Sequence, residues 1–207
     1  MYNSGMKPHK SIRLKGYDYS RTGAYFVTIC THDKECIFGA VTDGNLALHE
    51  FGRMVNAEWL KTAKIRKNVI LDVYIIMPNH FHGIILIIDN DDDSKERLHF
   101  KTGMAHRATT KGDGLIKMEF GKPKPGSLPV IVGSFKSAVA RQINSMRNTP
   151  GKEVWQRNYY EHIVRNQVEL DRIREYIVAN PARWRMDKEN PYGIPDEEEN
   201  KFWKDFS

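Results

Sequence analysis

Runs of β-branched and aromatic residues, bounded by turn-forming residues, predict four strands. The second and third runs are separated only by Pro78-Asn79, and such a short break is typical of an antiparallel hairpin. A smaller hairpin is indicated where Asp43-Gly44-Asn45 follows the apolar stretch 38–41. The four main predicted strands cover residues 24–30, 69–77, 81–88 and 154–164.

A different period, with apolar residues recurring every three or four positions, predicts three helices. Proline marks where the second and third helices should end. Pro150-Gly151 and Asn180-Pro181 follow the last apolar positions of these helices, and the residue before a proline avoids helical geometry. The predicted helices cover residues 46–63, 128–146 and 167–179.

The order of these elements is strand, helix, strand, strand, helix, strand, helix. Paired strands with helices between them favour an α+β fold of the ferredoxin-like kind. We therefore expect an antiparallel sheet with helices packed on one face.

Segments without periodicity divide the chain around this core. We expect a basic arm over residues 1–22, a domain over 23–185 that contains a long loop at 89–127, and an acidic tail over 186–207. The loop is long for a compact domain, which favours a functional or a disordered segment.

Composition and charge add a candidate partner. The 207 residues are 40% hydrophobic and 28% charged, which is ordinary for a globular protein and excludes collagen-like and coiled-coil classes. The net charge is +6, but the tail carries seven acidic and three basic residues, so the rest of the chain stands at +10. A basic body with an acidic tail is typical of nucleic-acid binders. Two cysteines and no apolar leader or membrane-length segment predict a cytoplasmic protein without a membrane partner.

The strongest chemical signal is Met-Pro-Asn-His-Phe-His, residues 77–82. Side chains two apart on a strand share a face, so His80 and His82 would present two imidazoles together, with Phe81 on the opposite face. Neutral imidazoles are good ligands for divalent metals. The alternative is two half-buried strand histidines that bind nothing.

The last predicted helix carries a second signal. Glu169, Arg172, Tyr176 and Asn180 follow one another at helical spacing, beside an apolar stripe. Tyr176 would then stand at the edge of the core with its hydroxyl free to reach a cleft, and Asn180 could offer an amide oxygen to a metal. The alternative, which the spacing alone favours, is a packing tyrosine followed by a capping asparagine.

Aromatic and basic residues make a third signal. Aromatics interleaved with arginine suit base stacking and phosphate contacts on single strands, whereas an ordinary aromatic strand and solvated helix faces are the alternatives. The candidate DNA-binding residues are Lys136, Arg141, Trp155, Arg157 and Arg165.

Together these residues are recognisable. The motif at 77–82 resembles the HUH motif of tyrosine transposases that act on single-stranded DNA. The stretches 154–165 and 176–181 are similar to REP-associated tyrosine transposases, which act on repetitive extragenic palindromes. The likeness extends from about residue 23 to residue 184.

The resemblance implies a fold, an activity and a site. It implies a ferredoxin-like catalytic domain, with His80 and His82 as metal ligands, Asn180 at the third ligand position and Tyr176 as nucleophile. It implies Mg or Mn as cofactor, and nicking and joining of hairpin or palindromic single-stranded DNA through a 5′-phosphotyrosine. It allows a monomer or a homodimer. Two alternatives stay open, namely a non-catalytic binder of structured single-stranded DNA or RNA and a metal-dependent phosphodiesterase that uses water.

Overall fold

The computed structural model describes residues 17–89 and 124–206. Most of the predicted basic arm and most of the predicted loop at 89–127 therefore lie outside the described residues. None of the helices in the described ranges is both long enough and apolar enough to cross a membrane.

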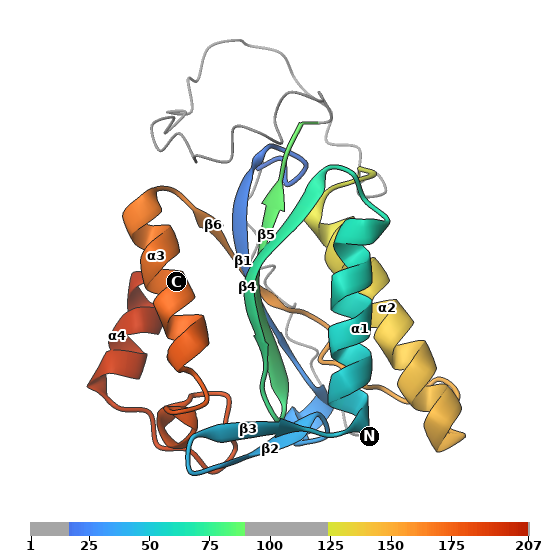
Figure 1. Ribbon diagram of the computed structural model, residues 1–207, viewed down its shortest axis with the longest axis vertical. Coiled ribbons are helices and arrows are strands. Elements are labelled where there is room, and N and C mark those ends of the chain that lie inside the picture. Colours follow the sequence, from blue (N-terminus) through green and yellow to red (C-terminus); the bar gives the residue numbers. More distant parts are fainter. Residues whose placement is uncertain (1–16, 90–123, 207) are drawn as a thin grey trace, which may run out of the picture.

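A four-stranded antiparallel sheet forms the centre of the fold (Figure 1). Its strands are β1 (Gly23–Cys30), β4 (Val69–Ile76), β5 (His80–Ile87) and β6 (Tyr160–Val164), in the order β4-β5-β1-β6. The two central strands, β1 and β5, are buried almost throughout, because helices cover both faces of the sheet. This arrangement confirms the predicted ferredoxin-like class.

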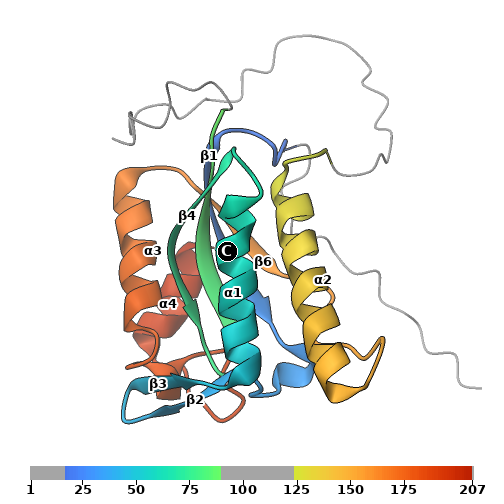
Figure 2. The ribbon, with the colours of Figure 1, turned by 45° about the vertical axis from the view of Figure 1, so that its right-hand side comes forward.

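Helices α1 (Glu50–Lys64) and α2 (Leu128–Arg147) pack on one face (Figure 2). Their apolar stripes meet alternate residues of β1 and β5 in the larger of two hydrophobic clusters. Trp59 stands at its centre, with its ring centroid 4.4 Å from that of Phe81 and 5.2 Å from that of Phe135.

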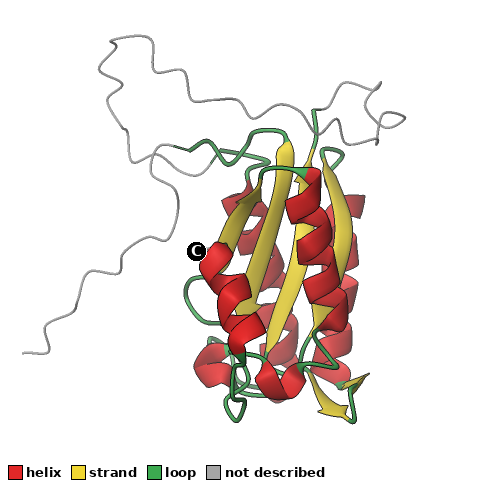
Figure 3. Cartoon of the chain, turned by 90° about the vertical axis from the view of Figure 1, so that its left-hand side faces the viewer, coloured by secondary structure: helices red, strands yellow, loops and turns green. Residues whose placement is uncertain are grey.

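Helices α3 (Gln167–Ala179) and α4 (Glu197–Asp205) cover the opposite face, and Figure 3 shows them in front of the sheet. Phe26 and Ile84 of the central strands pack there against Ile173 and Phe202. The sequence predicted helices on one face, and the structure adds this second layer. Its last helix, α4, lies within the predicted acidic tail.

Two predicted boundaries are wrong. Residues 45–48 pair in a hairpin of β2 (Gly39–Thr42) and β3 (Asn45–Leu48), so α1 begins at Glu50 rather than at residue 46. The hairpin turns through Asp43 and Gly44, both with positive φ, as the tight turn between twisted strands requires. The predicted strand at 154–164 pairs with β1 only from Tyr160, because Trp155 instead forms an isolated bridge that turns its ring into the core.

Candidate metal centre and adjoining tyrosine

The start of β5 places two imidazoles side by side. His80 and His82 are fully buried, and their ring centroids lie 4.5 Å apart. Phe81 points to the opposite face, where it packs on Trp59. The pleat of the strand therefore distributes the three side chains as the sequence predicts.

The ring of His80 is fixed by Asn79. The Asn79 amide nitrogen donates to the main-chain carbonyls of Lys34 at 3.2 Å and Glu189 at 2.7 Å, so its oxygen is left to accept. That oxygen lies 2.8 Å from Nδ1 of His80. Nδ1 must then carry the proton, and Nε2 of His80 keeps a free lone pair.

The ring of His82 is held by the neighbouring strand. Thr28 of β1 pairs with His82 in register, and its hydroxyl lies 2.8 Å from Nδ1 of the imidazole. Both histidines thus use Nδ1 for orientation and turn Nε2 to the same space. Fixing of Nδ1 by a hydrogen bond is the usual way that a protein orients a metal-binding histidine.

Two oxygen donors come from the segment that follows the strands. Asn180 ends α3, and Asp187 follows the short turn η3 (Trp184–Met186); both are about 1% exposed. Ligand atoms of His80, His82 and Asp187 all lie within 4.8 Å of one another, and Nε2 of His80 is 3.4 Å from Oδ2 of Asp187. Asn180 joins the group, because hydrogen bonding from its side chain favours the charged form of Asp187.

Four donor atoms in this group have no hydrogen-bond partner among the described residues. A buried polar atom without a partner costs on the order of 1–3 kcal/mol, so a group of them calls for an explanation. The atoms are Nε2 of His80, Nε2 of His82, Oδ1 of Asn180 and Oδ2 of Asp187.

The charge state of the group favours a cation. Burial lowers the pKa of His80 to about 3 and holds the pKa of His82 well below its usual value, so both rings are neutral at pH 7. Burial raises the pKa of Asp187 to about 6, which leaves it mostly ionised at pH 7. Two lone pairs on nitrogen, an amide oxygen and a carboxylate then face one another. This donor set fits a divalent metal ion.

Tyr176 of α3 lies against this group. Its ring stacks on Phe202 with centroids 3.8 Å apart and meets the ring of His82 edge-on at 5.4 Å. Its hydroxyl donates to Oε1 of Glu199 at 3.0 Å. Burial is the main cause that raises the pKa of Tyr176 far above its usual value, and burial also raises the pKa of Glu199. The tyrosine is therefore neutral in this arrangement.

Helix α4 covers the tyrosine and the histidines. Phe202, Trp203 and Phe206 bury their rings in the second hydrophobic cluster, and Nζ of Lys188 lies 3.3 Å from the centroid of the Trp203 ring. The start of the helix is anchored where the Arg183 guanidinium binds the capping residue Asp196. The acidic tail is thus part of the site.

No family model matches the chain. An uncharacterised protein of Haemophilus influenzae is 36% identical over 187 residues, which are 90% of this chain and 96% of the relative. A second protein of the same organism, assigned as a REP-associated tyrosine transposase, is 23% identical over 167 residues, or 80% of this chain and 74% of the relative. The chain is thus similar in sequence to a REP-associated tyrosine transposase over most of its length.

Two solved structures resemble the chain more distantly. One, a REP-associated tyrosine transposase bound to a REP hairpin, has a TM-score of 0.48 and 16% identity, and the match covers 83% of this chain and 73% of that one. The other, a protein of Deinococcus radiodurans assigned as a transposase, has a TM-score of 0.41 and 15% identity, covering 80% and 96%.

The predicted DNA-binding residues fall into two groups. Arg141, Arg157 and Arg165 are exposed. Lys136 and Trp155 are engaged inside the fold. Nζ of Lys136 donates to the carbonyls of residues 156–158, and burial lowers its pKa to about 8. Trp155 is 7% exposed and donates from Nε1 to the carbonyl of Lys136.

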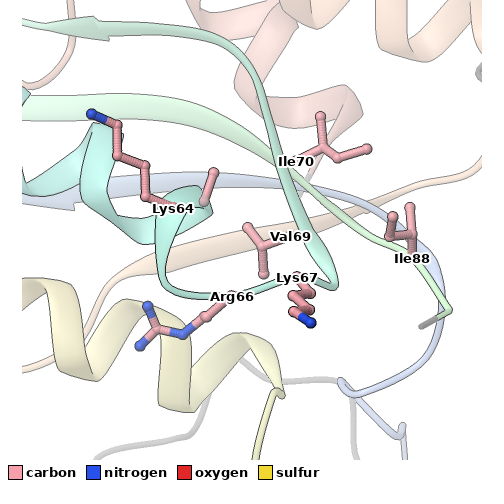
Figure 4. A pocket seen from close by; sticks show the side chains of 7 residues that line it. Lys64, Arg66, Lys67, Val69, Ile70 and Ile88 are labelled. Carbon is pink, nitrogen blue, oxygen red and sulfur yellow. The ribbon is translucent and has the colours of Figure 1, made fainter. Parts of the chain in front are cut away.

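A basic hollow lies at the other end of β5 (Figure 4). Lys64, Arg66 and Lys67 line it together with Val69, Ile70 and Ile88. Ile88 follows β5, whereas His80 begins it, so the strand separates this hollow from the metal ligands by roughly 25 Å. The hollow contains none of the candidate site residues.

The sequence missed Asp187 and Glu199. Both are acids in a segment read only for its charge, and no spacing links them to the histidines or to Tyr176. A sign was present in Asp196 followed three residues later by Glu199, which is the start pattern of a helix. That pattern predicts a helix but does not say what it covers.

Proposed function

We propose that this protein nicks and rejoins single-stranded DNA through a covalent bond between Tyr176 and a 5′ phosphate. The observation that carries the proposal is the set of four unpartnered donor atoms, buried beside the ring of Tyr176. A core without a ligand gains nothing from such a set. The sequence similarity to a REP-associated tyrosine transposase supports the same chemistry.

His80, His82, Asn180 and Asp187 would hold the metal. Asn180 was predicted from the resemblance, and Asp187 is added here because its carboxylate faces Nε2 of His80. Two nitrogen and two oxygen donors suit Mn, and the carboxylate and amide oxygens also suit Mg. When bound, the ion polarises the scissile phosphate and stabilises charge on its oxygens.

Tyr176 supplies the nucleophile. Its hydroxyl attacks the phosphorus, a tyrosine–5′-phosphate bond forms, and the 3′ oxygen leaves. The energy of the phosphodiester is kept in the new bond, so a second strand end can be joined without a nucleotide cofactor. Stacking on Phe202 and the edge contact with His82 fix the plane of the ring beside the ligands.

The DNA substrate is proposed to be hairpin or palindromic repeat DNA, in keeping with the resemblance to REP-associated tyrosine transposases. The body of the chain outside residues 186–207 carries a net charge of +10, which favours a polyanion. Arg141, Arg157 and Arg165 are the exposed candidates for phosphate contacts. Neutralising them one at a time should weaken binding and reduce its salt dependence.

The test is covalent capture. The protein is incubated with a panel of hairpin-bearing single strands and Mn or Mg, and the products are separated under denaturing conditions. We expect a protein–DNA adduct with the wild-type chain. Tyr176→Phe keeps the ring and removes the nucleophile, so we expect it to form no adduct. An adduct that survives in this variant would contradict the proposal.

A second candidate is a non-catalytic binder of structured single strands. The observation that favours it is that α4 covers the histidines and leaves His80 and His82 without exposed surface. Wild-type protein that binds the hairpins tightly but forms no adduct and releases no cleaved strand would support this candidate. Cleavage without an adduct would instead support a phosphodiesterase that uses water.

A further inference from the structure

Helix α4 carries one buried carboxylate that the proposed function does not yet use. Glu199 is 2% exposed, and none of the ion pairs among the described residues includes it. Its Oε1 instead accepts hydrogen bonds from the Tyr176 hydroxyl at 3.0 Å, from Nε1 of Trp203 at 2.7 Å and from the main-chain nitrogen of Lys188 at 3.3 Å. A carboxylate buried with neutral donors alone is costly and calls for a role.

The position of Glu199 in its helix makes this contact unusual. Asp196 is the N-cap and accepts from the Glu199 nitrogen, so Glu199 is the third residue of the helix. A glutamate there commonly folds back to the main-chain nitrogen of the cap. Here the side chain extends away from the cap and toward Tyr176. The helix therefore gives up a local contact in favour of the tyrosine.

The other polar groups beside Tyr176 are already occupied. The Nδ1 atom of His82 is bonded to Thr28, and its Nε2 is one of the proposed metal donors. Asp187 is also a proposed ligand. Glu199 is the carboxylate whose oxygen lies at hydrogen-bond distance from the Tyr176 hydroxyl, within the range required of a general base.

We propose that Glu199 is the general base of the reaction, a role that rests on the proposed function of Tyr176. As the Tyr176 oxygen bonds to phosphorus, its proton passes to Oε1 of Glu199. The bond from phosphorus to the 3′ oxygen breaks, and that oxygen keeps the electron pair and takes a proton from solvent. In the joining step a 3′ hydroxyl attacks phosphorus and loses its proton to solvent. The bond from phosphorus to the Tyr176 oxygen breaks, and Glu199 returns its proton to that oxygen.

The experiment measures the single-turnover rate of adduct formation with one hairpin strand and Mn. Glu199→Gln keeps the size of the side chain and an oxygen that can accept from Tyr176 and Trp203, but it cannot take a proton. We expect the rate to fall about 100-fold or more, with hairpin affinity unchanged and the thermal midpoint unchanged or raised, because a buried charge is removed. The matched control is Glu197→Gln, an equal change of charge at an exposed position in the same turn, and we expect it to react at the wild-type rate.

A second variant separates proton transfer from positioning. Fluorinated tyrosine at position 176 has a more acidic phenol and depends less on a base. In the Glu199→Gln background it should recover at least about tenfold of the lost rate, whereas a defect of positioning would not recover.

The outcomes distinguish this inference from the proposed function. If wild type forms no adduct, the proposed function fails and the base has no reaction to serve. If wild type forms the adduct, Tyr176→Phe does not, and Glu199→Gln reacts within threefold of wild type or faster, then the proposed function stands and Glu199 is not the base.

Discussion

The two faces of the sheet are built by the same strands and carry different chemistry. On β5, Phe81 and Ile85 point to α1 and α2, while His80 and His82 point to α3 and α4. The first face is an apolar core closed around Trp59. The second has apolar packing along the strands and polar donors at one end, where β5 begins.

The difference shows where the fold gives up stability. Burying a large aromatic side chain contributes on the order of 2–3 kcal/mol, whereas an unpartnered polar atom costs about 1–3 kcal/mol. The α3/α4 face holds four such atoms within one group. The α1/α2 face holds Nε1 of Trp59 on α1 and Oδ1 of Asn144 on α2, which belong to no such group of four. A face that keeps several unpartnered polar atoms is expected to bind a ligand whose binding free energy offsets their cost.

The largest expected effect comes from a substitution in the apolar core of the α1/α2 face. Trp59→Ala removes a fully buried ring that contacts Tyr74, Phe81 and Phe135, and we expect the free energy of unfolding to fall by about 3–5 kcal/mol. Urea unfolding measures the loss. The control is Trp59→Phe, which keeps a ring and removes an N–H that has no partner among the described residues, and so should cost much less. Equal losses in the two variants would show that the core face is not packed as described.

The next prediction concerns the α3/α4 face, where we expect a substitution to change the response to metal rather than the stability of the metal-free protein. Asp187→Asn removes a buried charge, so without metal we expect stability to stay within about 1 kcal/mol of wild type or to rise. Wild type should gain about 2.7 kcal/mol when Mn is 100-fold above its dissociation constant, and the variant should lose most of this gain. Thermal melting with and without Mn measures both.

A surface carboxylate controls for the change of charge. Glu175 is exposed on α3, and Glu175→Gln should respond to Mn as wild type does. An undiminished response of Asp187→Asn to Mn would remove Asp187 from the ligand set.

The sequence predicts the parts of the site that periodicity governs. The pleat of a strand puts His80 and His82 on one face, and helical spacing puts Tyr176 and Asn180 on one side of α3. These relations are local, and the fold preserves them. The contact between β5 and α3 is not local, and the sequence alone supplied it only through the family resemblance.

The residues that the sequence missed are placed by tertiary packing. Asp187 and Glu199 reach the site because Phe202 and Trp203 bury α4 against the sheet. Trp155 was also misjudged for this reason. The aromatic pattern predicted that it stacks on DNA bases, but in the structure its ring packs against that of Phe38, with centroids 5.0 Å apart. An aromatic residue looks the same in a sequence whether it faces solvent or a core.

The smallest expected effect concerns the interior of α2, a helix that packs on the face of the sheet opposite the proposed metal ligands. Gly133 is exposed in its interior, and an added Cβ would meet nothing within 4 Å, so Gly133→Ala should raise the free energy of unfolding by about 0.5–1 kcal/mol. The rate of adduct formation should not change, because the helix belongs to the face opposite the ligands. Gly52→Ala in α1 is the matched contrast, since its Cβ would collide with the main-chain carbonyl of Phe38 and the same substitution should destabilise. If Gly133→Ala altered the rate of adduct formation, the two faces would be coupled, and the separation of core from chemistry across the sheet would not hold.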